Sequence, residues 1–210
     1  MDYAYRFGDR SRLYLNTTNR CANCCTFCIR NRAADFGAAE LWGDHEPDFP
    51  LLQNAILQHG SLEKFSEFIW CGYGEPTFRL DLITQAAPWL RSRGAIIRLN
   101  TNGQACLIHD RDVLPELSCA VDVVSVSLNA PNAARYIELC RPNPDAFPNP
   151  DKIRSAPVLV WEAMLDFLRR APEYFSLVQA SVVGFSLTPA EIEQSREFAV
   201  SLGIKKFRIR

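Results

Sequence analysis

The chain has 210 residues, with 23 Lys and Arg against 24 Asp and Glu, and its formal net charge is −1. This balance gives no electrostatic reason to expect a nucleic-acid partner. The first residues lack the apolar core of a signal peptide, and no apolar run approaches the length of about 18 residues that a membrane span needs. We therefore expect a cytoplasmic protein without membrane contact, folded as a single domain over residues 1–210.

Apolar runs bounded by turn residues predict six strands, and helical spacing of apolar residues predicts a helix after most of them. The predicted strands cover residues 12–16, 65–71, 95–99, 121–128, 175–183 and 204–209. The predicted helices cover residues 48–58, 80–93, 111–117, 132–139, 156–170 and 188–202. Gly37 and Gly43 predict turns, and the four prolines of residues 141–150 predict a loop. This alternation indicates an α/β fold with a parallel sheet that has too few strands for an eight-stranded barrel.

Unusual polar or glycine-rich segments come directly after four of the predicted strands. They are the cysteine loop at 21–28, Gly72-Tyr73-Gly74-Glu75, Asn100-Thr101-Asn102-Gly103 and Ser127-Leu128-Asn129. Parallel α/β proteins bind ligands at the carboxyl ends of their strands. The sequence therefore predicts a site at this edge of the sheet.

The cysteine loop carries the clearest chemical signal. Cys21, Cys25 and Cys28 follow a C-x3-C-x2-C spacing, and three thiolates this close together are able to hold three corners of an iron–sulfur cube. The fourth iron would then lack a protein ligand, and an open coordination position marks a chemically active metal site. On this interpretation Cys24 is not a ligand.

Two other interpretations of the cysteines stay open. Cys21/Cys24 and Cys25/Cys28 also form two C-x2-C pairs, which would suit a zinc-stabilised binding module, although zinc sites usually separate such pairs widely. A fully ligated cluster would instead indicate an iron–sulfur electron-transfer or redox-sensing protein. Its fourth ligand would be one of Cys71, Cys106, Cys119 and Cys140. Of these, Cys71 ends a predicted strand at the site, whereas the others are expected in the core or in loops.

The cysteine spacing, with Phe27 before the last cysteine, resembles the radical S-adenosylmethionine (SAM) superfamily. The segment Gly72-Tyr73-Gly74-Glu75-Pro76 is similar to the "GGE" motif of that superfamily, with Tyr73 in place of a glycine. The likeness covers most of the chain and resembles in particular the radical SAM family associated with TatD-type nucleases, to which no reaction is attached. The segments that carry this resemblance are 14–31, 70–79, 98–103, 121–130 and 203–210.

The resemblance implies a partial (β/α)6 TIM-like barrel, a [4Fe–4S] cluster on Cys21, Cys25 and Cys28, and SAM bound through its amino and carboxylate groups to the open iron. It implies a one-electron donor such as a flavodoxin or ferredoxin. Reductive cleavage of SAM would yield a 5′-deoxyadenosyl radical that abstracts hydrogen from an unidentified small-molecule or protein substrate.

The resemblance and the strand-end positions together give a set of candidate SAM contacts, while no catalytic side chain is predicted. The candidates are Phe27, Tyr73, Gly74, Glu75, Asn100, Asn102, Ser127, Asn129 and Arg208. Each has an ordinary alternative: core packing for Phe27, a plain turn for the glycines, and Asx turns for the asparagines. Arg208 or Arg210 is suited to bidentate binding of a carboxylate or phosphate, or is simply solvated.

Overall fold

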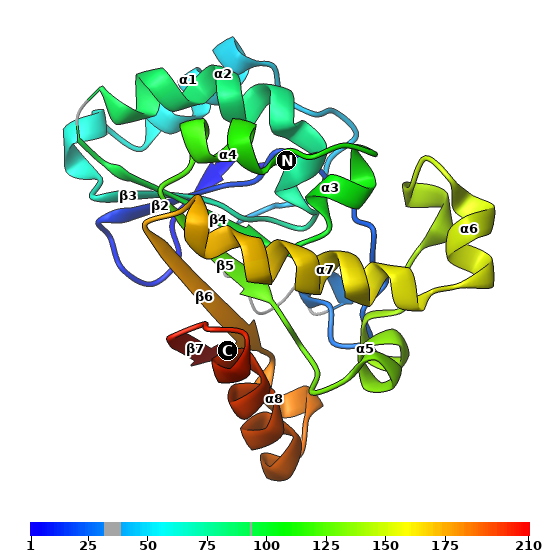
Figure 1. Cartoon of the computed structure of the whole chain (residues 1–210). Helices are drawn as coiled ribbons and strands as arrows, with labels where there is room; N and C mark the ends of the chain where they lie inside the picture. Colours follow the sequence, from blue (N-terminus) through cyan, green and yellow to red (C-terminus); the bar gives the residue numbers. More distant parts are fainter. Residues whose placement is uncertain (32–38, 93) are drawn as a thin grey trace.

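The computed structural model describes residues 1–31, 39–92 and 94–210, and its framework is one seven-stranded sheet in the order β1-β2-β3-β4-β5-β6-β7. The strands are β1 Ala4–Tyr5, β2 Arg12–Leu15, β3 Glu67–Trp70, β4 Ile96–Thr101, β5 Val123–Ser127, β6 Leu177–Val182 and β7 Lys206–Ile209. Strands β2 to β7 run parallel to their neighbours, and only β1 is antiparallel. The sheet does not close, because β1 and β7 are its two edges (Figure 1). The six predicted strands and the α/β class are confirmed, and the two-residue β1 was too short to predict.

Eight α-helices are found in the described parts of the chain. They are α1 Phe49–Gln58, α2 Leu80–Arg91, α3 Ala105–Ile108, α4 Leu114–Ala120, α5 Ala133–Cys140, α6 Pro150–Ser155, α7 Val158–Arg170 and α8 Pro189–Ser201. The sequence missed α3 and α6, which are too short to show a helical period. It also placed α4 three residues early. The helix begins at Leu114 because Pro115 fits the first turn of a helix and not its interior. The turn predicted at Gly37 and the helix end predicted at residue 93 lie outside the described residues.

The alternation of side chains along the strands gives the sheet two different faces. Leu15, Phe68, Leu99 and Val126 belong to the large apolar core, together with buried side chains of α2, α4 and α7. Figure 1 shows these helices stacked along one side of the sheet. The opposite positions form the face that we call the inner face, and they are largely polar. They include Asn100, Ser125 and Gln179, which the register pairs across β4, β5 and β6, and also Tyr14 and Arg98, which pair with Ile69 from its two sides.

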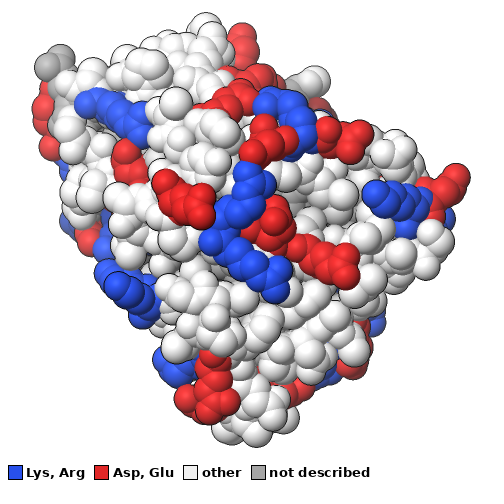
Figure 2. Space-filling view, viewed as in Figure 1, with Lys and Arg blue, Asp and Glu red and all other residues white. Residues whose placement is uncertain are grey.

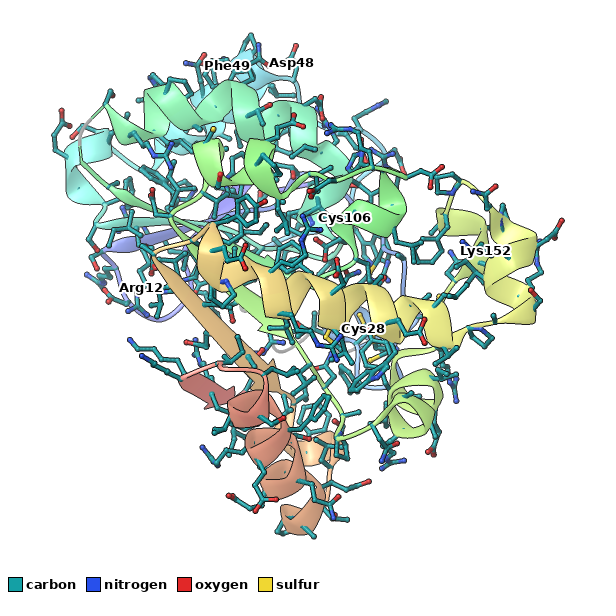
Figure 3. The ribbon with its side chains drawn as sticks, in the orientation of Figure 1. Arg12, Cys28, Asp48, Phe49, Cys106 and Lys152 are labelled. Carbon is teal, nitrogen blue, oxygen red and sulfur yellow. The ribbon has the colours of Figure 1, made fainter. Side chains whose placement is uncertain are left out.

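The parallel register brings the carboxyl ends of β2 to β7 to one edge of the sheet. In Figure 3, Cys28 lies toward this edge, away from Arg12 at the start of β2. On the face seen in Figure 2, basic and acidic side chains are interspersed, so that face offers no extended patch of one charge. In the part of the chain that the structure describes, no helix combines the length and the apolar character needed to cross a bilayer.

Candidate functional site

A cavity of about 340 Å³ opens at the carboxyl edge of the sheet and brings together segments that are far apart in the sequence. Its walls include every candidate ligand and cofactor residue except Arg208. They are Cys21, Cys25, Phe27, Cys28, Tyr73, Gly74, Glu75, Asn100, Asn102, Ser127 and Asn129. Cys71 and Arg210 also line it, whereas Arg208 lies on β7 outside this lining.

The cysteine loop is held in place by the segment that follows α5. The backbone N–H of Cys24 donates to the carbonyl of Arg141, and that of Thr26 donates to the carbonyl of Leu139, each at 2.9 Å. Asn143 N–H returns a hydrogen bond of 2.9 Å to Ala22. These bonds form a short antiparallel ladder between residues 22–26 and 139–143. The sequence predicted the second segment only as a loop and gave no sign of this pairing.

A buried polar network below the cysteine loop was also missed. The amide of Asn23 and the amide of Gln104 both donate to the hydroxyl of Tyr136, at 3.2 and 2.7 Å. Gln104 also donates to the side-chain oxygen of Asn23 at 3.3 Å. All three side chains are almost fully buried. The network therefore fixes the loop against the residue before α3 and against α5, since unpaired polar groups at this depth are costly.

The three loop thiols occupy different electrostatic surroundings. Burial, with the nearby charge of Glu75, raises the pKa of Cys21 to about 12. A hydrogen bond to the thiol of Cys140, together with burial, raises the pKa of Cys25 strongly. The guanidinium of Arg30 donates to Cys28 Sγ at 3.4 Å. Such thiols become thiolates when a cationic metal centre lies beside them.

The described residues contain no three His, Cys, Asp or Glu side chains converging as the ligands of one metal ion. Cys21, Cys25 and Cys28 all line the one cavity. Cys140 is fully buried at the end of α5 and does not line the cavity. The exposed side chain of Cys24 does not line it either.

Gly74 lies where the loop after β3 meets the chain that leads into the cysteine loop. A Cβ added to Gly74 would be 2.3 Å from the carbonyl oxygen of Thr18 and 2.5 Å from that of Arg20. The next residue, Glu75, donates its backbone N–H to the same Arg20 carbonyl at 2.8 Å. Only glycine permits this approach of two backbones.

Glu75 carries a buried carboxylate that connects β3 to β4. Its oxygens accept from the Thr77 backbone and hydroxyl at 3.2 and 2.9 Å, from the Thr101 hydroxyl at 2.8 Å and from Asn102 N–H at 2.7 Å. Burial raises the pKa of Glu75, although these four hydrogen bonds oppose the shift. The carboxylate therefore organises the cavity wall instead of pointing free into it.

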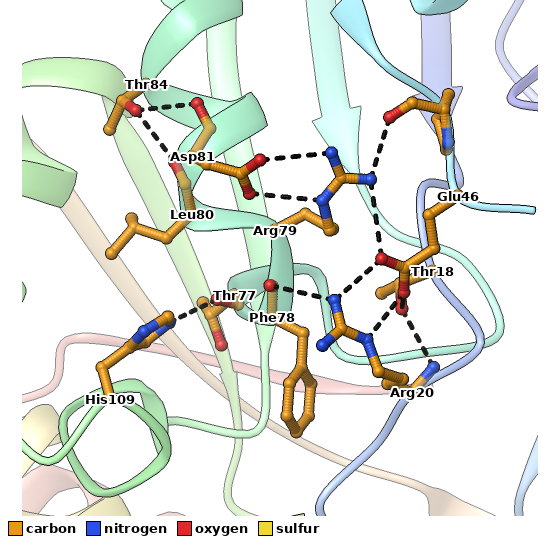
Figure 4. Close-up of polar contacts among 11 residues, drawn as sticks. Thr18, Arg20, Glu46, Thr77, Phe78, Arg79, Leu80, Asp81, Thr84 and His109 are labelled. Carbon is orange, nitrogen blue, oxygen red and sulfur yellow. Dashed lines mark hydrogen bonds and ion pairs between the residues drawn. The ribbon is translucent and has the colours of Figure 1, made fainter.

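The segment before the cysteines is also fixed by charge, as Figure 4 shows. Both nitrogens of the Arg20 fork donate to the carboxylate of Glu46, at 2.7 and 2.8 Å. Thr18 donates its hydroxyl to the same carboxylate, and Arg79 approaches it at 3.6 Å. Arg79 also pairs with Asp81. This network joins the residue before Cys21 to the start of α2.

The model of the Radical SAM superfamily matches residues 15–199. The chain belongs to the radical SAM superfamily. It is therefore an enzyme of the radical SAM class, and the superfamily uses a [4Fe–4S] cluster and SAM as its cofactors. The match is to the superfamily, so the narrower resemblance to the TatD-associated family stays a prediction. Among curated protein sequences, no relative matches the chain.

Solved structures of radical SAM enzymes share the fold. A structure of TYW1 with a lysine-pyruvate adduct bound is 12% identical with a TM-score of 0.58, and the match covers 96% of this chain and 66% of that one. SuiB from Streptococcus suis bound to its precursor peptide SuiA is 14% identical with a TM-score of 0.60, covering 95% of this chain and 38% of that one. The chain thus spans less than two thirds of the length of each neighbour. At these identities the likeness establishes the fold, which confirms the partial-barrel prediction.

The cavity also offers polar atoms that suit the radical SAM cofactor. Among the described residues, Nδ2 of Asn102 and Oδ1 of Asn129 are buried without a hydrogen-bond partner, and both residues line the cavity. The Asn102 nitrogen is a donor and the Asn129 oxygen is an acceptor. The amino-acid end of SAM, with its carboxylate and its amine, requires one of each. The oxygen of Asn102 accepts from Gln104 N–H at 3.0 Å, so the Asx turn exists and still leaves the amide nitrogen available.

The aromatic candidates combine packing with exposure to the cavity. Phe27 is partly buried against the main core and also lines the cavity. Tyr73 packs with Tyr5 and Leu41 in a small separate cluster, and Trp42 meets its ring edge-on at 5.6 Å between centroids. The core-packing alternative for Phe27 and a contact with SAM are therefore compatible.

Proposed function

We propose that this radical SAM enzyme binds a [4Fe–4S] cluster through Cys21, Cys25 and Cys28 and cleaves SAM reductively to start a radical reaction. The observation that carries the proposal is that three cysteines line one cavity together with Asn102 and Asn129, each of which has a buried side-chain atom without a hydrogen-bond partner. When bound, the reduced cluster would supply one electron to SAM, and cleavage of SAM would give methionine and a 5′-deoxyadenosyl radical for hydrogen abstraction.

The residues of the chain position these groups. The ladder to residues 139–143 holds the cysteine loop rigid, so its thiols keep their spacing. The close contact at Gly74 sets the distance between the loop after β3 and the chain before the cysteine loop. In this proposal the Gly74 backbone binds the amine of SAM. Asn102 donates a hydrogen bond to the amino-acid end of SAM, and Asn129 accepts one from it. Phe27 and Tyr73 cover the adenine, and the inner face of the sheet receives the substrate.

The test is anaerobic reconstitution of the full chain with iron and sulfide, followed by addition of SAM and a strong one-electron reductant. The expected results are a visible iron–thiolate absorbance, iron and sulfide in the ratio of a four-iron cluster, and formation of 5′-deoxyadenosine. Cys25→Ala should abolish the cluster, whereas the matched control Cys24→Ala should keep it. A protein that takes up only zinc, or that needs Cys24 for its cluster, would contradict the proposal.

One observation favours a second candidate, a fully ligated cluster for electron transfer. Cys71 lines the same cavity as the three loop cysteines, and burial raises its pKa. The variant Cys71→Ser separates the two functions. If Cys71 is a fourth ligand, the variant should lose the cluster or shift its spectrum strongly, and the wild type should form no 5′-deoxyadenosine. If our first proposal holds, the cluster should remain in Cys71→Ser.

The electron donor and the substrate are proposed at the level of class. A flavodoxin or ferredoxin supplies the electron, and the substrate is a small molecule or a protein segment. The structure of SuiB contains a precursor peptide, which supports a peptide as one class to test here. The expected cytoplasmic location provides the reducing conditions that such a cluster needs.

A further inference from the structure

The last strand places three basic side chains on the inner face of the sheet. Lys206, Arg208 and Arg210 alternate along β7 and its end, so they point to the same side. The register pairs Lys206 with Gln179 and Arg208 with Ser181, and these β6 residues pair in turn with Ser125 and Ser127. The three cations therefore stand beside the polar part of the inner face, at the open edge of the sheet.

Arg210 connects this row of cations to the cavity. Its backbone is held by Val182 and Gly184 through hydrogen bonds of 2.9 Å each, and its guanidinium donates to Ser127 Oγ at 2.7 Å. Arg210 lines the cavity, and although the residue as a whole is exposed, protein atoms around its guanidinium lower its pKa by desolvation. The positive end of this side chain is therefore fixed at the cavity wall.

The positive charge of Arg208 acts on the pKa of one tyrosine of the inner face. Burial raises the pKa of Tyr14 on β2, and the positive charges of Arg12 and Arg208 act against this rise.

The carboxylates of the inner face are already used by other groups. Glu67 pairs with Arg98 at 2.6 Å and with Arg12 at 3.2 Å, and the Glu75 carboxylate accepts four hydrogen bonds from its neighbours. Within residues 1–31, 39–92 and 94–210, no acidic side chain lies within ion-pair distance of Lys206, Arg208 or Arg210. The row is a local excess of positive charge in a chain whose net charge is −1.

We propose that the substrate carries a carboxylate or phosphate group, which Arg208 and Arg210 bind at the open edge of the sheet while the rest of the molecule enters the cavity. This inference rests on the proposed function and adds the substrate class. Guanidinium groups suit such anions because their planar fork donates two parallel hydrogen bonds. Arg208, a candidate SAM contact on the sequence alone, thereby becomes a substrate contact, because it does not line the wall that holds the cysteines.

The test is site-resolved protection from phenylglyoxal, a reagent that modifies arginine. The reconstituted full chain, saturated with SAM, is treated in inorganic phosphate, in succinate, or in chloride of equal ionic strength, and each arginine is followed by peptide mass spectrometry. The exposed Arg10 is the internal reference. Modification of Arg208 and Arg210 should slow roughly tenfold at an anion concentration about ten times its dissociation constant, as mass action requires, while Arg10 is unaffected.

The two anions distinguish the source of the charge, since protection by phosphate alone supports a phosphorylated substrate and protection by succinate alone a carboxylate. Arg208→Gln should weaken the protection of Arg210, whereas the control Lys205→Gln, with the same loss of charge on an exposed neighbouring residue, should not. Circular dichroism checks that both variants fold. Failure of both anions to protect Arg208 and Arg210 would overturn the proposal. Cluster content and 5′-deoxyadenosine, measured on the same preparation, report separately on the proposed function.

Discussion

The backbone N–H of Asn102 donates to Oε2 of Glu75 across 2.7 Å, so the carboxylate that follows β3 also fixes the end of β4. Asn102 then keeps its side-chain nitrogen unpaired at the cavity wall. The geometry of the SAM-binding wall thus depends on a buried carboxylate that need not touch SAM.

Glu75→Gln should destabilise the protein by roughly 1–3 kcal/mol, because an amide nitrogen must replace one acceptor oxygen and face a donor. The free energy of unfolding, from urea titration of the apoprotein, measures the loss. The exposed Glu162 on α7 gives the matched control, and Glu162→Gln should change stability by no more than about 0.5 kcal/mol. Equal stability of Glu75→Gln and wild type would show that the four hydrogen bonds are dispensable.

Gly74→Ala should reduce both stability and SAM affinity, because the added Cβ collides with the carbonyls of Thr18 and Arg20. Overpacking of this kind costs roughly 1–3 kcal/mol. Gly203 provides the comparison, since a Cβ there meets open space but its φ of +80° is unfavourable for alanine. Gly203→Ala should cost roughly 1–2 kcal/mol and leave SAM affinity unchanged. Urea titration and equilibrium dialysis of SAM measure the two effects, and unchanged SAM binding in Gly74→Ala would refute the assignment.

Asn129 combines a left-handed backbone, with φ of +59°, and an unpaired buried oxygen in the cavity. Asn129→Gly should keep the stability of the fold but lose the hydrogen bond to SAM. Asn129→Ala should lose both, with a backbone cost of roughly 1–2 kcal/mol. A lost hydrogen bond of about 1 kcal/mol corresponds to roughly fivefold weaker SAM binding in both variants. Wild-type affinity in Asn129→Gly would exclude the side chain as a SAM contact.

Glu46 should make the segment before the cysteines sensitive to acid. Partial burial acts to raise its pKa, but hydrogen bonds from Arg20 and Thr18 outweigh burial and lower it. A carboxylate with a lowered pKa in the fold contributes stability above its unfolded pKa, and this contribution is lost as the pH falls through the folded value. The effect therefore lies below about pH 4.5.

The measurement is the urea midpoint as a function of pH, compared between wild type and Glu46→Gln. The difference between the two proteins should be largest at neutral pH and should shrink as the pH falls through the acidic range. Hydrogen exchange at Arg20, whose N–H donates to the Thr18 hydroxyl at 3.0 Å, should be faster in the variant at neutral pH. A stability difference that does not vary with pH would show that the carboxylate charge is not involved.

The sequence predicted the parallel strands well because their signals are local. Runs such as Phe68-Ile69-Trp70 are apolar and end at glycines, and the cysteine spacing lies within eight residues. The elements that the sequence failed to predict lack such local signals. Helix α3 has four residues and β1 has two, and both are stabilised by neighbours that are distant in the sequence.

The sequence by itself determined the class of chemistry, since the spacing of Cys21, Cys25 and Cys28 and the strand-end motifs are read without any long-range contact. Only the tertiary structure decided which side chains share the cavity and which are used elsewhere. It placed Cys140 against Cys25, occupied the Glu75 carboxylate with internal hydrogen bonds, and brought Arg210 to the cavity wall while leaving Arg208 outside. The physical reason is that these relationships arise from strand register and from pairing of buried polar groups across about 30 to 115 residues of sequence, which no local pattern encodes.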